Sequence, residues 1–251
     1  MMTVELASLA NGFSCYTTCT SKDEASFIYK EIYEDQCYDG TELPESPFII
    51  DAGANIGLFS LYMKKKYPSA TILAFEPAPE TYDVLRRNLE LHNMSEVETY
   101  AYGLSSKATT TKLTYYPNLP GNSTLRPKEK VELKSAIAEH FGEAAANHNF
   151  AGAQEIEINL QRLSHFLGSR EGLEKIDLLK IDVEGAELDV LLGVDDIHWN
   201  MTRNIVLETA VNSGVKPEIE KLLRDKGFIV TSEGACWAPA NFFMIHARRD
   251  D

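Results

Sequence analysis

A short apolar run that ends in an acidic residue and a glycine loop constrains this chain more than any other feature. Residues 48–50, Phe-Ile-Ile, have the composition of a strand that is buried on both faces, and the run ends at Asp51. Gly53 and Gly57 then permit a tight turn that leaves backbone N–H groups free at the start of a helix. We therefore expect a central strand of a parallel sheet, followed by a loop that binds a cofactor.

The loop does not carry the fingerprint of a dinucleotide-binding site. A G-x-G-x-x-G pattern placed on Gly53 would need glycines at the positions of Asp51 and Ile56. The spacing is Asp-x-Gly-x-x-x-Gly instead, and its carboxylate repels a phosphate and attracts a cation. A second apolar strand, residues 72–75, ends at Glu76, about twenty residues beyond the glycines, where an acid can accept hydrogen bonds from both hydroxyls of a ribose. Taken singly, the glycines could be plain turn residues and Asp51 a helix cap.

Apolar strands alternate with helical patterns along the chain, which predicts an α/β fold with a doubly wound, mostly parallel seven-stranded sheet in a single domain over residues 1–251. The last two strands follow each other directly, so we expect an antiparallel edge. The seven strands of the sheet are expected at 48–50, 70–75, 97–102, 176–181, 204–207, 228–230 and 242–245, with added strands at 109–116 and 155–160. Helices are expected near 22–35, 58–67, 79–92, 128–149, 163–167, 183–193 and 216–226.

Two segments lie outside the repeating pattern of the sheet. Residues 1–46 are expected to form a helical cover over the cofactor end, with Ser21 and Glu24 as a capping box at the start of its helix. Residues 117–152 contain a loop and a polar helical stretch that a parallel-sheet unit does not need. Insertions at a ligand edge are often lids, so we interpret 117–152 as a substrate lid, with a plain surface excursion as an equal alternative.

Net charge and cysteine content limit the ligands and metals that we expect the chain to bind. The 251-residue chain has a net charge of −14, which offers no basic patch for a nucleic acid and fits a small neutral or cationic substrate better. Its four cysteines, Cys15, Cys19, Cys37 and Cys236, lack the paired spacing of a zinc site, so we expect free thiols and no structural metal. The N-terminal residues show no signal-peptide pattern and no apolar run approaches membrane-spanning length, so we expect a cytoplasmic protein without a membrane segment.

The segment Leu-Leu-Lys-Ile-Asp-Val-Glu-Gly-Ala-Glu at residues 178–187 resembles the signature of the FkbM-type methyltransferases. The loop at 51–57 and Phe-Glu-Pro at 75–77 are similar to the cofactor half of that family, so the resemblance covers most of residues 48–208. It implies a class I methyltransferase fold, S-adenosylmethionine as cofactor, and methylation of hydroxyls on sugars or secondary metabolites. The residues expected to bind the cofactor are Asp51, Gly53, Ala54, Asn55, Gly57, Glu76, Pro77, Gly103, Leu104 and Asp182.

Methyl transfer to an alcohol benefits from a base that takes the hydroxyl proton. Asp182 and Glu184 are the first candidates and Glu208, at the end of the next strand, is the reserve. Glu184 and Glu187 are expected to share one face of a helix, where Glu187 can also be a simple partner of the helix dipole. A metal held by Asp182 and Glu208 is a less favoured variant. The histidines His140, His148 and His165 are weaker candidates for the base.

Three functional hypotheses follow. The first is an O-methyltransferase that acts on a small hydroxylated molecule, either free or tethered to a carrier protein. The second keeps the cofactor but moves the acceptor to nitrogen, to a protein or to RNA, and the acidic charge disfavours RNA. The third is a non-catalytic scaffold that only binds the cofactor. The sequence does not specify the acceptor or the oligomeric state.

Overall fold

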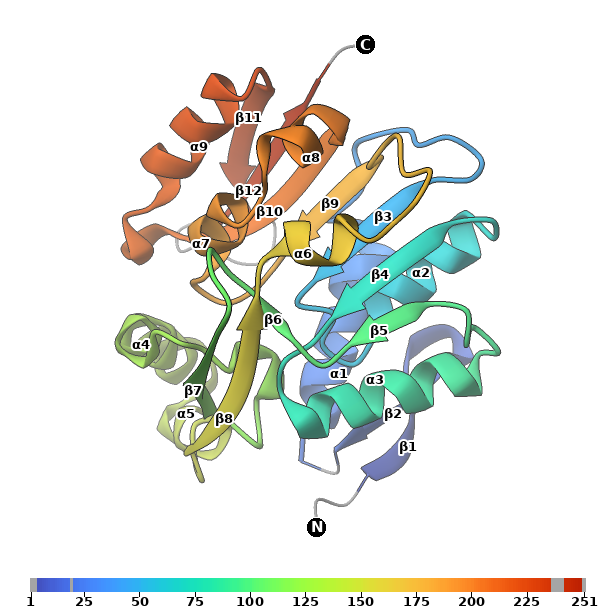
Figure 1. The fold of residues 1–251 in the computed structure, drawn as a ribbon. Coiled ribbons are helices and arrows are strands. Elements are labelled where there is room, and N and C mark those ends of the chain that lie inside the picture. Colours follow the sequence, from blue (N-terminus) through green and yellow to red (C-terminus); the bar gives the residue numbers. More distant parts are fainter. Residues whose placement is uncertain (1–3, 19, 236–241, 250–251) are drawn as a thin grey trace.

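A computed structural model describes residues 4–18, 20–235 and 242–249 of the chain. Its centre is a seven-stranded sheet with the order β11-β12-β10-β9-β3-β4-β5 (Figure 1). Strand β12 runs antiparallel to both of its neighbours, β10 and β11, and the other paired strands are parallel. The expected α/β sheet is thus confirmed, with the antiparallel strand one position in from the edge. The strands are β3 (Phe48–Ala52), β4 (Thr71–Phe75), β5 (Glu98–Tyr100), β9 (Leu178–Ile181), β10 (Asn204–Ala210), β11 (Ile229–Gly234) and β12 (Phe242–Arg248).

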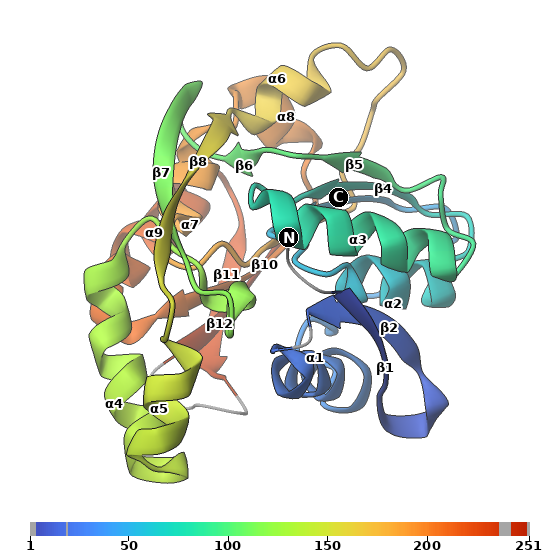
Figure 2. The same cartoon turned by 90° about the horizontal axis from the view of Figure 1, so that it is seen from below.

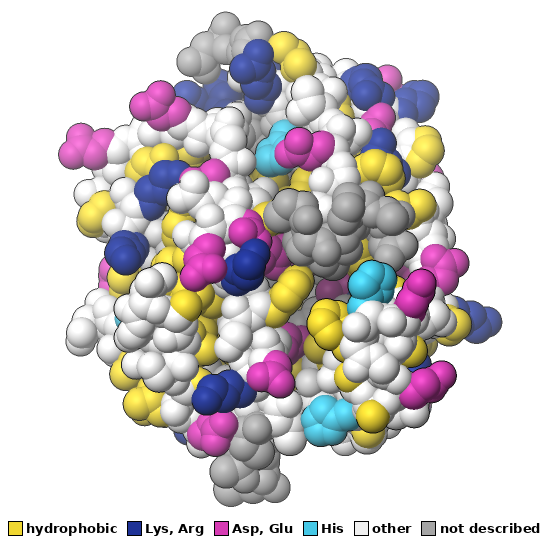
Figure 3. Space-filling view, turned by 180° about the vertical axis from the view of Figure 1, so that it is seen from behind, with side chains coloured by type: hydrophobic (Ala, Val, Ile, Leu, Met, Phe, Trp, Pro, Cys, Tyr) yellow, Lys and Arg dark blue, Asp and Glu magenta, His cyan; other side chains and the backbone are white. Residues whose placement is uncertain are grey.

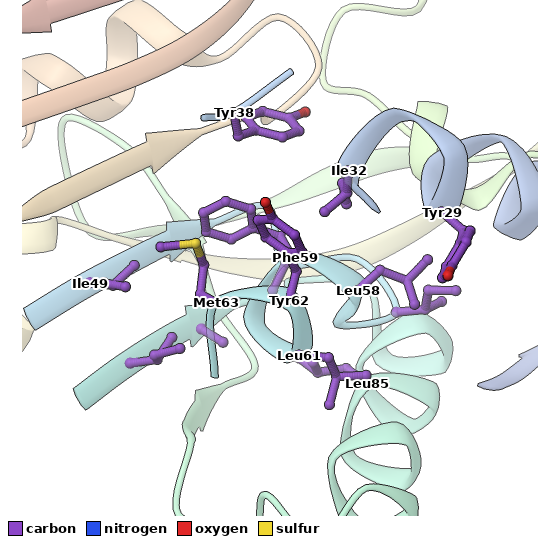
Figure 4. Packing of buried hydrophobic residues seen from close by; sticks show 14 of the residues in the cluster. Tyr29, Ile32, Tyr38, Ile49, Leu58, Phe59, Leu61, Tyr62, Met63 and Leu85 are labelled. Atoms are coloured by element: carbon purple, nitrogen blue, oxygen red, sulfur yellow. The ribbon is translucent and has the colours of Figure 1, made fainter. Parts of the chain in front are cut away.

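Successive residues of a strand point to opposite faces of the sheet, so the apolar strands present hydrophobic side chains on both faces. Helices cover each face. In β3, Ile49 belongs to one buried cluster and Ile50 to the other. The first cluster packs under α1 (Lys22–Tyr29), α2 (Leu58–Lys66) and α3 (Pro79–Leu91), and Figure 4 shows Leu61 of α2 beside Leu85 of α3. The second packs under α6 (Leu163–Leu167), α7 (Glu187–Leu192), α8 (Asp196–Met201) and α9 (Lys216–Asp225).

A smaller three-stranded sheet carries the insertion predicted as a lid. Its order is β6-β8-β7, with β6 (Gly103–Leu104), β7 (Thr109–Tyr115) and β8 (Gln154–Gln161). The chain between β7 and β8 forms η3 (Pro120–Asn122), η4 (Pro127–Glu129), α4 (Lys130–Phe141) and α5 (Glu143–Asn149) (Figure 2). The prediction of a single helix at 128–149 is wrong, because Gly142 adopts a φ of +90° and separates two helices.

The N-terminal segment contains a β-hairpin in addition to the expected helix. Strands β1 (Val4–Ser8) and β2 (Ser14–Thr18) pair antiparallel around the turn η1 (Ala10–Gly12). Asn88 of α3 anchors this hairpin, since its buried amide donates to the backbone oxygens of Tyr16, at 3.0 Å, and Ile56, at 2.8 Å. The hairpin is thereby tied to the glycine loop, because Ile56 lies within that loop.

The helix that follows the hairpin does not begin with the predicted capping box. The Ser21 side chain makes no cap hydrogen bond; its Oγ instead lies 2.8 Å from the hydroxyl of Thr17. Glu24 accepts a hydrogen bond from the backbone N–H of Gly121, at 2.9 Å. Helix α1 then continues into a short π-helix, η2 (Lys30–Glu34). The capping-box prediction fails because Ser21 contacts the nearby hydroxyl of Thr17 and Glu24 accepts from the distant backbone of Gly121, so neither side chain is left for the helix end.

Other predictions concern charge, thiols and membranes. Figure 3 shows basic side chains scattered among acidic ones on the back of the molecule, with no continuous basic patch on that face. Cys15 is buried and is not part of a disulfide, whereas Cys19 and Cys236 lie outside the described residues. Within the described ranges, no helix is both long enough and apolar enough to cross a membrane. A last short turn, η5 (Val211–Ser213), follows β10.

Candidate functional site

The glycine loop between β3 and α2 is fixed by its own hydrogen bonds. The N–H groups of Gly53 and Ala54 donate to the backbone oxygen of Phe75, at 3.0 and 2.8 Å, and the N–H of Gly57 donates to that of Ala54. These three N–H groups are therefore used within the fold, and the expectation of free N–H groups at the start of α2 stays a prediction. Only glycine fits at position 53, since its φ is +78° and an added Cβ would lie 1.8 Å from the backbone oxygen of Asp182.

Glu76 is held at the end of β4 by two backbone donors. Its Oε2 accepts from the N–H of Asn55, at 3.0 Å, and its Oε1 from the N–H of Ala78, at 2.9 Å. Only 8% of Glu76 is exposed, and this burial raises the pKa of the carboxyl to about 7 in spite of both donors. Each carboxylate oxygen has a further lone pair, so Glu76 can still accept hydrogen bonds from a ligand.

Lys180 is a central residue that the sequence patterns did not identify. Its Nζ lies 3.2 Å from Oδ1 of Asp51 and 3.6 Å from Oδ2 of Asp182, and it donates to the backbone oxygen of Gly53 at 2.8 Å. The ammonium also lies 5.5 and 5.6 Å from the ring centres of Tyr38 and Phe59. The sequence does contain a signal for this role: a lysine stands inside the apolar run of β9, and a buried charge needs a partner of opposite charge.

Asp51 has a different surrounding from the one expected. It is fully buried, and the cation it attracts is Lys180. Its other oxygen accepts from the hydroxyl of Ser60, at 2.7 Å. Asp51 therefore holds the carboxyl ends of β3 and β9 together.

Asp182 follows β9 and is open to solvent on one side. The hydroxyl of Tyr38 donates to its Oδ2 at 2.9 Å, and Lys180 approaches the same oxygen. Its Oδ1 makes no hydrogen bond or ion pair with a described residue, and 29% of the side chain is exposed. Burial and the nearby Asp182 carboxylate keep the pKa of Tyr38 well above its usual value, so Tyr38 stays a proton donor.

Two hollows meet at Asp182 and Glu184, which line both of them. The first, here called the loop hollow, lies against the glycine loop and is closed by apolar residues of β7 and β8. The second, here called the lid hollow, lies between the start of α4 and the end of β10. Of the residues predicted to bind the cofactor, the loop hollow is lined by Gly53, Asn55, Glu76, Pro77, Gly103, Leu104 and Asp182, whereas Asp51, Ala54 and Gly57 do not line it.

Glu184 is held in place by contacts with the insertion at 117–152. It adopts a φ of +54° in the loop before α7, which begins at Glu187. The prediction that Glu184 and Glu187 share one face of a helix is therefore wrong. The ammonium of Lys130 forms an ion pair with Glu184 and also donates to Oδ1 of Asn122, at 2.9 Å. The Thr124 hydroxyl donates to the backbone oxygen of Glu184 at 2.6 Å. Burial raises the pKa of Glu184, and Lys130 opposes this effect.

Glu208 and Glu187 line the lid hollow only. Burial, with Asp182 nearby, raises the pKa of Glu208 well above its usual value, and burial raises that of Glu187 to about 7. The three histidines considered as bases line neither hollow. Over residues 4–18, 20–235 and 242–249, no group of three or more acidic, histidine or cysteine side chains is placed to hold a metal ion.

The chain is similar to known methyltransferases over most of its length. A family model described as the methyltransferase FkbM domain matches residues 51–230. Methyltransferase sdnD of Sordaria araneosa is 57% identical over 239 residues, which cover 92% of each chain. The 31-O-demethyl-FK506 methyltransferase FkbM of Streptomyces tacrolimicus is 35% identical over 258 residues, covering 98% of this chain and 97% of that one.

A solved structure shows the same fold at low sequence identity. The FkbM methyltransferase from Methylobacillus flagellatus superposes with a TM-score of 0.57 at 11% identity. The match covers 87% of this chain and 47% of that one.

We predict that Lys180→Met lowers the free energy of unfolding by about 3–5 kcal/mol, because it leaves Asp51 buried without its cation. The double variant Lys180→Met/Asp51→Asn removes both charges and should recover at least about 1 kcal/mol of this loss. Urea denaturation measures both. Lys66→Met, which breaks a more exposed ion pair with Asp39, is the control and should cost less than about 1 kcal/mol. A double variant less stable than Lys180→Met would contradict the assigned pairing.

Proposed function

The chain belongs to the FkbM family of S-adenosylmethionine-dependent methyltransferases, and we propose that it methylates a hydroxyl oxygen of a small molecule. The observation that carries this proposal is the meeting of the two hollows at Asp182 and Glu184. A cofactor in the loop hollow and an acceptor in the lid hollow would face each other across these residues. The name of the Streptomyces relative, which refers to a 31-O-demethyl compound, supports oxygen as the acceptor atom.

The loop hollow has the groups that the cofactor requires. Glu76 would accept hydrogen bonds from the ribose, and Gly103 with Leu104 would border the adenine. Asn55 supports this fit, because its Oδ1 is buried, makes no hydrogen bond with a described residue, and belongs to a side chain that lines the hollow. When bound, S-adenosylmethionine supplies an electrophilic methyl group next to the lid hollow.

Asp182 is the residue that we assign as the proton acceptor. Its Oδ2 is held by Tyr38 and Lys180, which fixes the carboxylate and leaves Oδ1 for the acceptor hydroxyl. Glu184 fits this role less well, because Lys130 already neutralises it. Glu208 lines only the lid hollow, so it is better placed to contact the body of the acceptor.

We expect Asp182→Asn to lower the turnover number by about a hundredfold or more while it changes the dissociation constant of S-adenosylhomocysteine by less than about threefold. The amide keeps the shape of the carboxylate but cannot take a proton. Calorimetric titration with the cofactor, followed by methyl-transfer assays on a panel of hydroxylated compounds, measures both quantities. Asp189→Asn is the matched control, because Asp189 is more exposed and lines neither hollow.

Turnover by Asp182→Asn within twofold of the unchanged protein would remove Asp182 as the base. Failure of the unchanged protein to bind either sulfur cofactor would favour the non-catalytic scaffold instead.

The pKa of Glu76 predicts a pH dependence of cofactor binding. A ribose hydroxyl donates more strongly to an ionised carboxylate, so binding favours the ionised form of Glu76. Because burial raises the pKa to about 7, affinity for S-adenosylhomocysteine should increase by up to about tenfold as the pH rises from about 6 to about 8. Calorimetry across this range should show that Glu76→Gln loses this increase. An equal pH dependence in both proteins would show that Glu76 does not carry it.

A further inference from the structure

Two acids in the lid hollow are buried and incompletely partnered. Glu208 is 8% exposed, and its carboxyl group makes no hydrogen bond or ion pair with a described residue. Glu187 is 2% exposed; its Oε1 accepts from the N–H of Gly185 at 2.7 Å, while its Oε2 has no such partner. Buried polar atoms normally have hydrogen-bond partners, so both side chains are suited to contact a bound molecule.

The charges around Glu208 are mainly negative. Carboxylates of Asp182 and Glu184, in the loop after β9, and of the buried Glu31 of η2 act on it from two other parts of the chain. Among the described residues that line the hollow, Lys130 is the only base, and its ammonium is used by Glu184 and Asn122. An anion placed in the hollow would therefore meet several carboxylates and no available cation.

We infer that Glu208 is a specificity-determining residue, and that the lid hollow accepts hydroxylated molecules without a negative charge and rejects those with a carboxylate or phosphate near the reacting hydroxyl. This inference rests on the proposed function, because it assigns the lid hollow to the acceptor. A neutral polyol donates hydroxyl hydrogen bonds to Glu208 and Glu187 and satisfies both of them. A ligand carboxylate has no hydrogen to donate, and it adds a negative charge beside Asp182 and Glu184, which in addition to burial already raise the pKa of Glu208.

The test compares two probes that differ in one charge. The probes are 4-nitrophenyl β-D-glucopyranoside, which is neutral, and 4-nitrophenyl β-D-glucuronide, which carries a carboxylate. Binding of each probe to the protein saturated with S-adenosylhomocysteine, and methyl transfer to each probe, are measured at about pH 8.5. The neutral probe should be preferred by on the order of a hundredfold, as expected for like charges about 5 Å apart at an intermediate effective dielectric constant.

Two variants test whether Glu208 is responsible for this selectivity. Glu208→Gln removes the ionisable carboxyl group but keeps a hydrogen-bonding group, and it should reduce the preference for the neutral probe by about tenfold. Glu132→Gln removes an equal charge from the exposed rim of the same hollow and should change the preference by less than about threefold, because exposed charges are screened. Equal effects of the two substitutions would overturn the role of Glu208.

The remaining outcomes also decide the inference. Equal binding of the two probes by the unchanged protein, or binding of neither, would overturn it. The proposed function would survive either result if the protein binds S-adenosylhomocysteine and methylates another hydroxylated compound. If the neutral probe binds selectively but no methyl transfer occurs to any acceptor, the charge selectivity stands and the proposed function fails.

Discussion

The buried ammonium of Lys180 is the contact on which the rest of the site depends. It lies between the carboxylates of Asp51 and Asp182 and donates to the backbone of the glycine loop. Those three groups come from the ends of two neighbouring parallel strands, β3 and β9. Without the lysine, two acids would meet in a region of low dielectric constant with no opposing charge. The ion pair thus allows an acidic site to form at this edge of the sheet.

Asp182 and Glu184 separate two hollows at this edge of the sheet, and each of them is held by a different part of the chain. Asp182 is fixed by Lys180 of β9 and by Tyr38 of the N-terminal segment, whereas Glu184 is fixed from the insertion by Lys130. The insertion also reaches the N-terminal helix through Gly121 and Glu24. Glu184 and Gly121 both line the loop hollow, so a displacement of the insertion would alter its wall. The separation of the two hollows therefore depends on the docking of residues 117–152.

Local patterns predicted the sheet and much of the loop hollow. The buried strands at 48–50, 72–75 and 178–181 are short apolar runs, and acids at or directly after their ends mark the edge where α/β folds bind ligands. Seven of the ten residues expected to hold the cofactor line one hollow, as the shared edge of parallel strands implies. Asp51 does not line this hollow because it pairs with Lys180, a residue that is distant in sequence and is brought close by the strand order.

Competing side-chain contacts and local backbone geometry explain the other differences between prediction and structure. The pair Ser21 and Glu24 has the spacing of a capping box, but Thr17 and Gly121 provide competing partners. The spacing of Glu184 and Glu187 predicts one helix for both, yet Glu184 has a left-handed backbone and precedes the helix. The contact of Glu24 with Gly121 cannot be predicted from a local pattern, because it depends on how separate segments pack.

The most direct test of the central claim is a crystal structure of the protein with S-adenosylhomocysteine. We predict that the ribose hydroxyls will contact Glu76 and that the sulfur atom will lie on the side of the loop hollow that faces Asp182. The lid hollow should then remain open next to the sulfur. A cofactor bound away from Glu76, or with its sulfur turned from the boundary between the two hollows, would contradict the account.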